Sequence, residues 1–157
     1  MTPSELSRIE RHILIRAPRQ RVWRALTNPE EFARWFRVEA SGAFTPGAHV
    51  DMVSTHPLGA GAKFSVAVEA MEPERLFSWR WHPGVKPPDA DYDAEPSTLV
   101  EFRLEDGEGG TLVTVVESGF DRLSLARRAK AFEENQKGWE IQLAALDEYA
   151  GKPASRR

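Results

Sequence analysis

One carboxylate stands at the end of a strand-like run where it can face the protein interior. In TLVTVVESGF (111–120), alternate residues point to opposite faces of a strand, so Thr111, Val113, Val115 and Glu117 share one face. Both alternating sets are apolar enough that periodicity alone leaves the inward face open. If Glu117 faces inward, it needs hydrogen bonds, protonation or both, because an unpartnered buried charge is costly. The alternative is a strand-end glutamate in solvent.

A polar stripe near the C-terminus offers partners for this carboxylate. Asn135, Gly138 and Gln142 are spaced by three and four residues, so on a helix they share one stripe beside Trp139. The amides of Asn135 and Gln142 can donate to Glu117. We expect Glu117→Gln to be tolerated, because it preserves shape and hydrogen bonding. A mid-helix glycine costs about 1 kcal/mol relative to alanine, so Gly138 indicates a close approach to the helix. Either a ligand or the sheet itself can make that approach.

Large aromatic residues alternate with polar ones in FSWRWHP (77–83). On a strand, Phe77, Trp79 and Trp81 share one face. Two interpretations remain open: these rings fill a packed core, or they line an apolar cavity with a few polar groups. The neighbouring strands are expected to add to the same face the side chains of Phe64, Val66, Val68, Val100, Phe102 and Leu104.

The remaining candidates for chemistry are weaker. Asp89, Asp91 and Asp93 have the spacing of a calcium loop, but Ala94 and Val100 stand where the turn glycine and the bidentate glutamate belong. The surrounding loop 83–96 is long enough to be a lid over a binding site, or else a solvated spacer. The four histidines show no metal-binding spacing, and nucleotide-binding or serine-hydrolase motifs do not occur. We therefore predict no metal and no cofactor.

Composition limits the choice of partners. The 157 residues carry 21 basic and 24 acidic side chains, a net charge of −3, which offers no broad footprint for nucleic acid. The chain has no cysteine, and its longest apolar runs fall short of the ~20 residues that cross a bilayer. We expect a cytoplasmic protein with no membrane insertion and no nucleic-acid partner.

Periodicity predicts an α+β domain spanning 1–157, with frayed tails at 1–7 and 151–157. Helical spacing around Val22–Leu26 and Phe32–Phe36 predicts two short helices, separated by Asn28-Pro29. A long proline-free segment, 124–149, predicts one C-terminal helix. The expected strands lie near 9–16, 47–55, 62–71, 75–82, 97–105 and 110–118, with a further short one at 37–43.

Three segments resemble a known family. IRAPRQRVWRALTNPEEFARWF (15–36), DYDAEPSTLVEF (91–102) and ESGFDRL…RRAKAFEENQKGWEIQLAALDEY (117–149) are similar to the polyketide cyclase/START-like superfamily, in its branch related to the activator of Hsp90 ATPase. The resemblance implies a helix-grip fold, in which a curved antiparallel sheet wraps around the C-terminal helix and encloses a hydrophobic cavity. It implies no single activity, because the superfamily includes carriers, cyclases and co-chaperone domains.

The sequence favours a binding module over an enzyme. Our first hypothesis is that a small hydrophobic molecule binds between sheet and helix, with its polar end near Glu117 and Asn135. The second is a cyclase-like or hydrolytic enzyme with Glu117 as general acid or base. The third is a protein-interaction domain similar to the Hsp90 activator; a homodimer also remains open. The predicted ligand-binding residues are Trp35, Phe64, Val66, Trp79, Trp81, Val100, Phe102, Val115, Glu117, Asn135, Gly138, Trp139 and Gln142.

Overall fold

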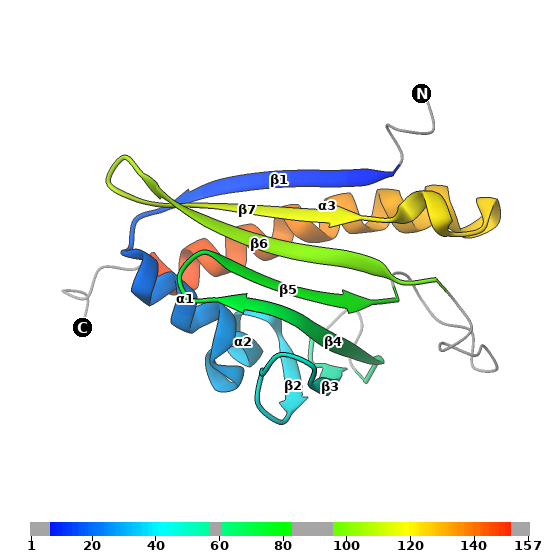
Figure 1. The fold of residues 1–157 in the computed structure, drawn as a ribbon, viewed down its shortest axis with the longest axis horizontal. Helices are drawn as coiled ribbons and strands as arrows, with labels where there is room; N and C mark the ends of the chain where they lie inside the picture. Colours follow the sequence, from blue (N-terminus) through cyan, green and yellow to red (C-terminus); the bar gives the residue numbers. More distant parts are fainter. Residues whose placement is uncertain (1–6, 57–60, 83–95, 152–157) are drawn as a thin grey trace.

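Helices and strands are segregated along the chain. A computed structural model describes residues 7–56, 61–82 and 96–151. The elements follow the order β1 (Arg8–Ile15), α1 (Arg19–Thr27), α2 (Pro29–Phe36), β2 (Val38–Ser41), β3 (His49–Ser54), β4 (Lys63–Glu72), β5 (Leu76–Trp81), β6 (Thr98–Gly107), β7 (Gly110–Ser118), η3 (Phe120–Arg122) and α3 (Leu125–Ala150) (Figure 1).

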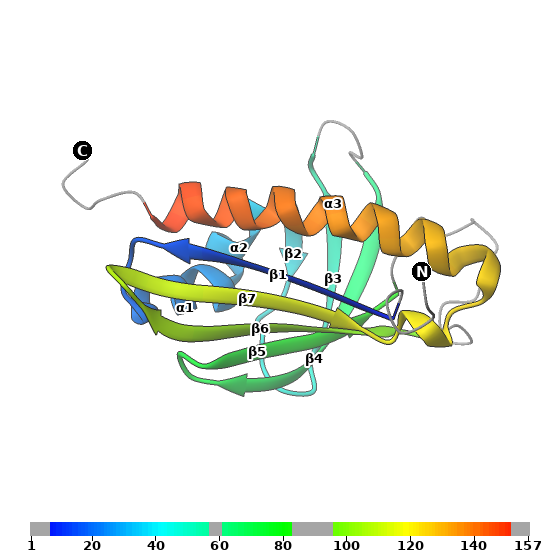
Figure 2. The same cartoon turned by 90° about the horizontal axis from the view of Figure 1, so that it is seen from above.

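A single antiparallel sheet and the long helix α3 form the two layers of the fold. The strand order is β1-β7-β6-β5-β4-β3-β2, and every neighbouring pair is antiparallel. Seen from above, α3 runs along one side of the curved sheet, and α1 and α2 lie near the C-terminal end of α3 (Figure 2). This is the predicted α+β helix-grip fold.

The element boundaries follow from local sequence signals. Asn28 ends α1 and caps α2, since its side-chain oxygen accepts a hydrogen bond from the Glu31 backbone N–H at 3.1 Å. Pro29 then occupies the first turn, where a missing N–H costs nothing. After β7, Gly119 turns the chain with φ = +101°, a conformation that favours glycine. The short strand expected at 37–43 is present as β2, whereas Asp89, Asp91, Asp93 and most of the proposed lid loop lie outside the described residues.

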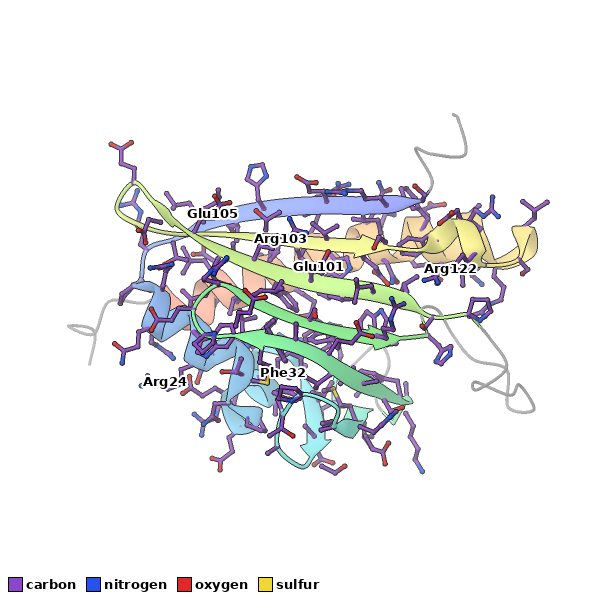
Figure 3. All side chains as sticks on the ribbon, viewed as in Figure 1. Arg24, Phe32, Glu101, Arg103, Glu105 and Arg122 are labelled. Atoms are coloured by element: carbon purple, nitrogen blue, oxygen red, sulfur yellow. The ribbon has the colours of Figure 1, made fainter. Side chains whose placement is uncertain are left out.

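Strand alternation divides the side chains between the two faces of the sheet. On β6, Val100 and Phe102 are fully buried beneath α3. Glu101, Arg103 and Glu105 alternate with them on the opposite face, which is turned toward the viewer in Figure 3. The outer face is therefore charged, and the inner face builds the core.

Aromatic rings pack against one another between the sheet and the helices. We call this group the aromatic core; its residues are buried, with centroids of neighbouring rings 4.6–6.5 Å apart. Edge-to-face pairs predominate around Phe32, an arrangement that aromatic side chains favour. The aromatic core consists of Phe32, Phe36, Phe44, Phe77, Trp79, Phe102 and Trp139.

An ion-pair cluster joins both short helices to the end of α3. Glu31 on α2 accepts from Arg21 at 2.5 Å and from the Tyr149 hydroxyl at 3.0 Å, and it pairs with Arg24 at 2.7 Å. The Arg21 guanidinium also lies 5.0 Å from the centre of the Tyr149 ring. Burial acts to raise the pKa of Glu31, but the hydrogen bonds from Arg21 and Tyr149 and the two arginine charges outweigh it, so the pKa is lowered.

This lowered pKa predicts an acid-sensitive contribution to stability. The pKa of Glu31 is lower in the folded protein than in the unfolded chain. Such a carboxylate makes its full contribution to stability when the pH is above its pKa in the unfolded chain. The contribution is lost as the pH falls through its pKa in the folded protein. We expect Glu31→Gln to lower the free energy of unfolding by about 1–2 kcal/mol at pH 7, and the deficit to shrink toward pH 3. Urea unfolding across this range measures it. The exposed neighbour Glu30, changed to Gln, is the control, and a deficit independent of pH would contradict the assignment.

Candidate ligand site at Glu117

Glu117 is buried at the end of β7, and its carboxylate accepts hydrogen bonds from four protein side chains. Its side chain is 0% exposed, which confirms the inward orientation. Oε1 accepts from Asn135 Nδ2 at 2.9 Å and from Trp139 Nε1 at 2.8 Å. Oε2 accepts from Trp81 Nε1 at 2.8 Å and from Thr98 Oγ1 at 2.6 Å. We call these five residues the Glu117 hub.

Strand register and helix packing bring the hub together. Glu117 pairs with Val100 on β6, and Thr98 lies one inward position along the same strand. Thr98 in turn pairs with Trp81 on β5, which places three hub residues on adjacent strands. The middle of α3 supplies the helix side of the hub, through Asn135 and Trp139, where the helix passes beside the sheet (Figure 2).

The hub compensates a negative charge with neutral groups. All four partners are uncharged, and three of the donating groups, two indoles and an amide, offer only N–H hydrogens, as an ionised carboxylate requires. A carboxylate has about four acceptor sites, so these bonds occupy its full capacity. Glu117 therefore works as a tie between β5, β6, β7 and α3.

Two of the predicted site residues serve other contacts. Gln142 Nε2 donates to the Phe36 carbonyl at 3.4 Å, so it ties α3 to the end of α2 and is not a partner of Glu117. Trp35 donates to the Ala25 carbonyl at 2.8 Å and braces α2 against α1. Among the other predicted residues, those fully buried on the inner face of the sheet are Val66, Trp79, Val100, Phe102 and Val115.

Two predicted aromatics are only partly buried, at the end of the sheet where the hub lies. Trp81 stacks on Trp139 with ring centroids 5.7 Å apart, and Phe64 meets Trp81 edge-to-face at 5.9 Å. Trp81 also lies 6.4 Å from Phe36, which links this pair to the aromatic core. The apolar surface thus continues outward from the core along Trp81 and Phe64.

Gly138 leaves one side of α3 open, next to Trp139 in the sequence. Apart from its chain neighbours and the backbone of its own helix, a Cβ atom placed on Gly138 would meet no described atom within 4 Å, so the glycine does not serve tight packing against the described sheet. The residue lies between Asn135, which reaches Glu117, and Gln142, which reaches Phe36. The side of α3 at Gly138 is therefore open between these two contacts.

Sequence reasoning missed Thr98 and the roles of the two indoles. Thr98 continues the inward alternation of Val100 and Phe102, and a buried hydroxyl needs a partner, so the signal was present. Buried tryptophan N–H groups also seek acceptors, and Glu117 was the acidic side chain placed on the inner face. Spacing alone predicts only apolar surface for Trp81 and Trp139.

The described residues carry neither a metal cluster nor a membrane-spanning helix. Within 7–56, 61–82 and 96–151, His, Cys, Asp and Glu side chains do not gather in groups of three or more suited to a metal ion. None of the helices in these ranges combines the length and apolar character that crossing a bilayer requires.

The fold and its long C-terminal helix define a helix-grip protein of the polyketide cyclase/START-like class. The chain belongs to the family of activator of Hsp90 ATPase homolog 1-like proteins, whose sequence pattern it matches over residues 16–151. A comparison with curated proteins finds no match.

Solved structures of bacterial proteins share this fold. Protein MLL2253 from Mesorhizobium loti is 22% identical, with a TM-score of 0.73 over 90% of this chain and 95% of its own. The Aha1 dimer from Colwellia psychrerythraea is 19% identical, with a TM-score of 0.69 over 92% and 96%. CalU16 from Micromonospora echinospora is 24% identical, with a TM-score of 0.60 over 95% and 78%. At these identities the likeness concerns the fold.

Proposed function

We propose that this protein binds a small hydrophobic molecule between the sheet and α3, at the open position beside Gly138. The observation that carries the proposal is the open side of α3 at Gly138, the residue before Trp139, whose ring stacks on the partly buried Trp81. Apolar walls with a few converging polar groups are typical of ligand sites, and Asn135 and Gln142 supply polar groups on either side.

The geometry of Glu117 favours binding over turnover. A general base must accept a proton from the substrate, and all four acceptor sites of this carboxylate are occupied by protein donors. Substrate access would require one of these donors to leave. Glu117 therefore supports the site by holding Trp81, Trp139 and Asn135 in place.

The outer face of the sheet gives less support to the hypothesis that the protein acts as a protein-interaction domain. Its charges pair within the face, as in Arg80–Glu69 at 2.8 Å and Arg103–Glu101 at 3.3 Å. Such alternating, internally paired charges are typical of a solvated surface.

Substitutions on α3 test the proposal with the neutral fluorescent probe N-phenyl-1-naphthylamine. We expect the probe to bind the wild type saturably. Gly138→Trp should fill the open position and weaken binding by a factor of about 10, which corresponds to about 1.4 kcal/mol of binding free energy. Ala144→Trp is the matched control, because Ala144 is exposed on the same helix, and it should leave affinity unchanged. Gly138→Ala should keep binding and raise the free energy of unfolding by about 1 kcal/mol.

Equal affinities of the Gly138→Trp and Ala144→Trp variants would place the probe elsewhere and contradict the proposed site. Native mass spectrometry of freshly purified protein complements the titration. A co-purified molecule should be displaced by the probe if both use the same position.

A further inference from the structure

Strand β1 forms one edge of the sheet, and half of its backbone groups point away from β7. The sheet begins with β1, and the described residues add no strand beyond it (Figure 1). The Gly119 N–H donates to the Ser7 carbonyl at 3.1 Å, so the backbone of Ser7 faces β7. The direction of these backbone groups alternates from residue to residue along an antiparallel strand. The open side of β1, which we call the free edge, therefore carries the backbone groups of Arg8, Glu10, His12 and Leu14.

One side chain covers the middle of the free edge. Arg11 Nη1 donates to the Glu10 carbonyl at 2.9 Å, and Arg11 Nε donates to Glu140 on α3 at 3.2 Å. The guanidinium thus occupies an acceptor of the free edge and is held there from the helix. Strand edges pair readily with other strands, and proteins commonly block them with charged side chains. Because an exposed ion pair contributes little free energy, a partner strand can displace Arg11 at small cost.

The sequence of β1 is complementary to itself. A second copy of β1 added across a two-fold axis runs antiparallel, and its outward-pointing backbone groups meet those of the first copy. In the register centred on Arg11, Glu10 lies opposite His12 of the second copy, at two symmetric positions. The carboxylate can accept a hydrogen bond from the imidazole. Registers centred on Glu10 or His12 lose this pair and place two carboxylates or two imidazoles opposite each other at the axis instead.

The register centred on Arg11 has a further favourable contact and one unfavourable contact. It places Arg8 of one copy opposite Leu14 of the other. Leu14 is 39% exposed in the single molecule, and the apolar stem of an arginine can cover it. At the axis, however, the two Arg11 side chains face each other, and like charges directly opposite across a strand pair are destabilising. Arg11 therefore opposes pairing both by covering the Glu10 carbonyl and by its charge.

We propose that the free edge of β1 is a docking site for β1 of a second copy of this chain, and that Arg11 blocks it in the single molecule. When Arg11 is removed, the two sheets join through β1 into one continuous sheet, held by backbone hydrogen bonds and by the Glu10–His12 pairs. Arg11 is then an autoinhibitory residue of this surface. The surface lies at the sheet edge and is independent of the proposed ligand site at Gly138.

Sedimentation equilibrium of the full chain over a range of protein concentrations tests this proposal. Arg11→Ala should dimerise about tenfold more tightly than the wild type, because each dimer loses two covering contacts and one contact between like charges. Arg80→Ala is the matched control. Arg80 also forms an exposed ion pair, with Glu69 at 2.8 Å, but it lies on β5 in the middle of the sheet. Its removal should leave association unchanged.

Further changes in the Arg11→Ala protein locate the interface. His12→Pro removes an N–H of the free edge and none that bonds β7, so the fold should persist and the dimer should be lost. Glu10→Lys removes the acceptor for His12, and His12→Glu sets two carboxylates against each other, so each should weaken the dimer. The combination of Glu10→Lys with His12→Glu pairs opposite charges again and should restore it. This exchange tests the register even if His12→Pro fails to fold.

Three results would overturn the proposal. Equal association of Arg11→Ala and the wild type would mean that Arg11 does not block the edge. A dimer that survives His12→Pro in a folded protein must use another surface. Failure of the combined exchange at Glu10 and His12 to restore association would contradict the register centred on Arg11.

Discussion

Glu117→Leu is expected to lower the free energy of unfolding by about 3–5 kcal/mol, because it leaves several buried donors without an acceptor. The indoles of Trp81 and Trp139 and the amide of Asn135 can only donate from the nitrogens that now bond Glu117. The Thr98 hydroxyl can rotate toward another acceptor. Leucine is similar in size, so the loss comes mainly from the missing hydrogen bonds. Urea unfolding at pH 7 measures the change.

Glu105→Leu is the matched control for this substitution. Glu105 is exposed on the outer face of β6 (Figure 3), so the same change there should cost less than about 0.5 kcal/mol. If both variants lose equally little stability, the four hydrogen bonds of Glu117 do not stabilise the packing of α3 on the sheet.

The hub also changes what is expected of Glu117→Gln. The sequence suggested that glutamine would be tolerated, because it preserves shape and hydrogen bonding. In the hub, however, an amide can accept on one side only, and its NH₂ would face at least one indole or amide donor. We now expect a loss of about 1–3 kcal/mol, between the wild type and the leucine variant.

The fold could be predicted from the sequence because its signals are local. Alternation fixed the strand 110–118 at the bounds it has in β7, and Asn28-Pro29 separated α1 from α2 as expected. The family resemblance added the arrangement that periodicity leaves open, namely a curved sheet around the C-terminal helix.

The hub was only partly predictable, because its partners depend on distances that spacing does not give. Asn135 and Gln142 share a helical stripe, but seven residues separate them by about 10 Å along α3, too far for both to reach one carboxylate. Asn135 reaches Glu117, and Gln142 reaches the Phe36 carbonyl. The meeting of Trp81 with Trp139 depends on how α3 crosses β5, which no residue pattern encodes locally.

The aromatic rings differ in how completely the protein encloses them. Phe32 is 0% exposed and contacts the rings of Trp35, Phe36, Phe44 and Trp79 at 4.6–5.8 Å. Such a ring is enclosed on several sides by protein. Phe64 is partly exposed and contacts the ring of Trp81 at 5.9 Å, so part of its surface remains uncovered by the described residues.

Phe32→Ala should therefore destabilise the protein much more than Phe64→Ala. We expect Phe32→Ala to lower the free energy of unfolding by about 3–5 kcal/mol, as removal of a packed aromatic side chain leaves a void that its neighbours fill only in part. Phe64→Ala should cost only about 1–2 kcal/mol, because less of its surface is buried, but it should weaken binding of N-phenyl-1-naphthylamine. Urea unfolding and probe titration of both variants measure the two effects. A loss below about 2 kcal/mol in Phe32→Ala would mean that its ring already borders an empty space, and the aromatic core would then be the wall of a larger cavity.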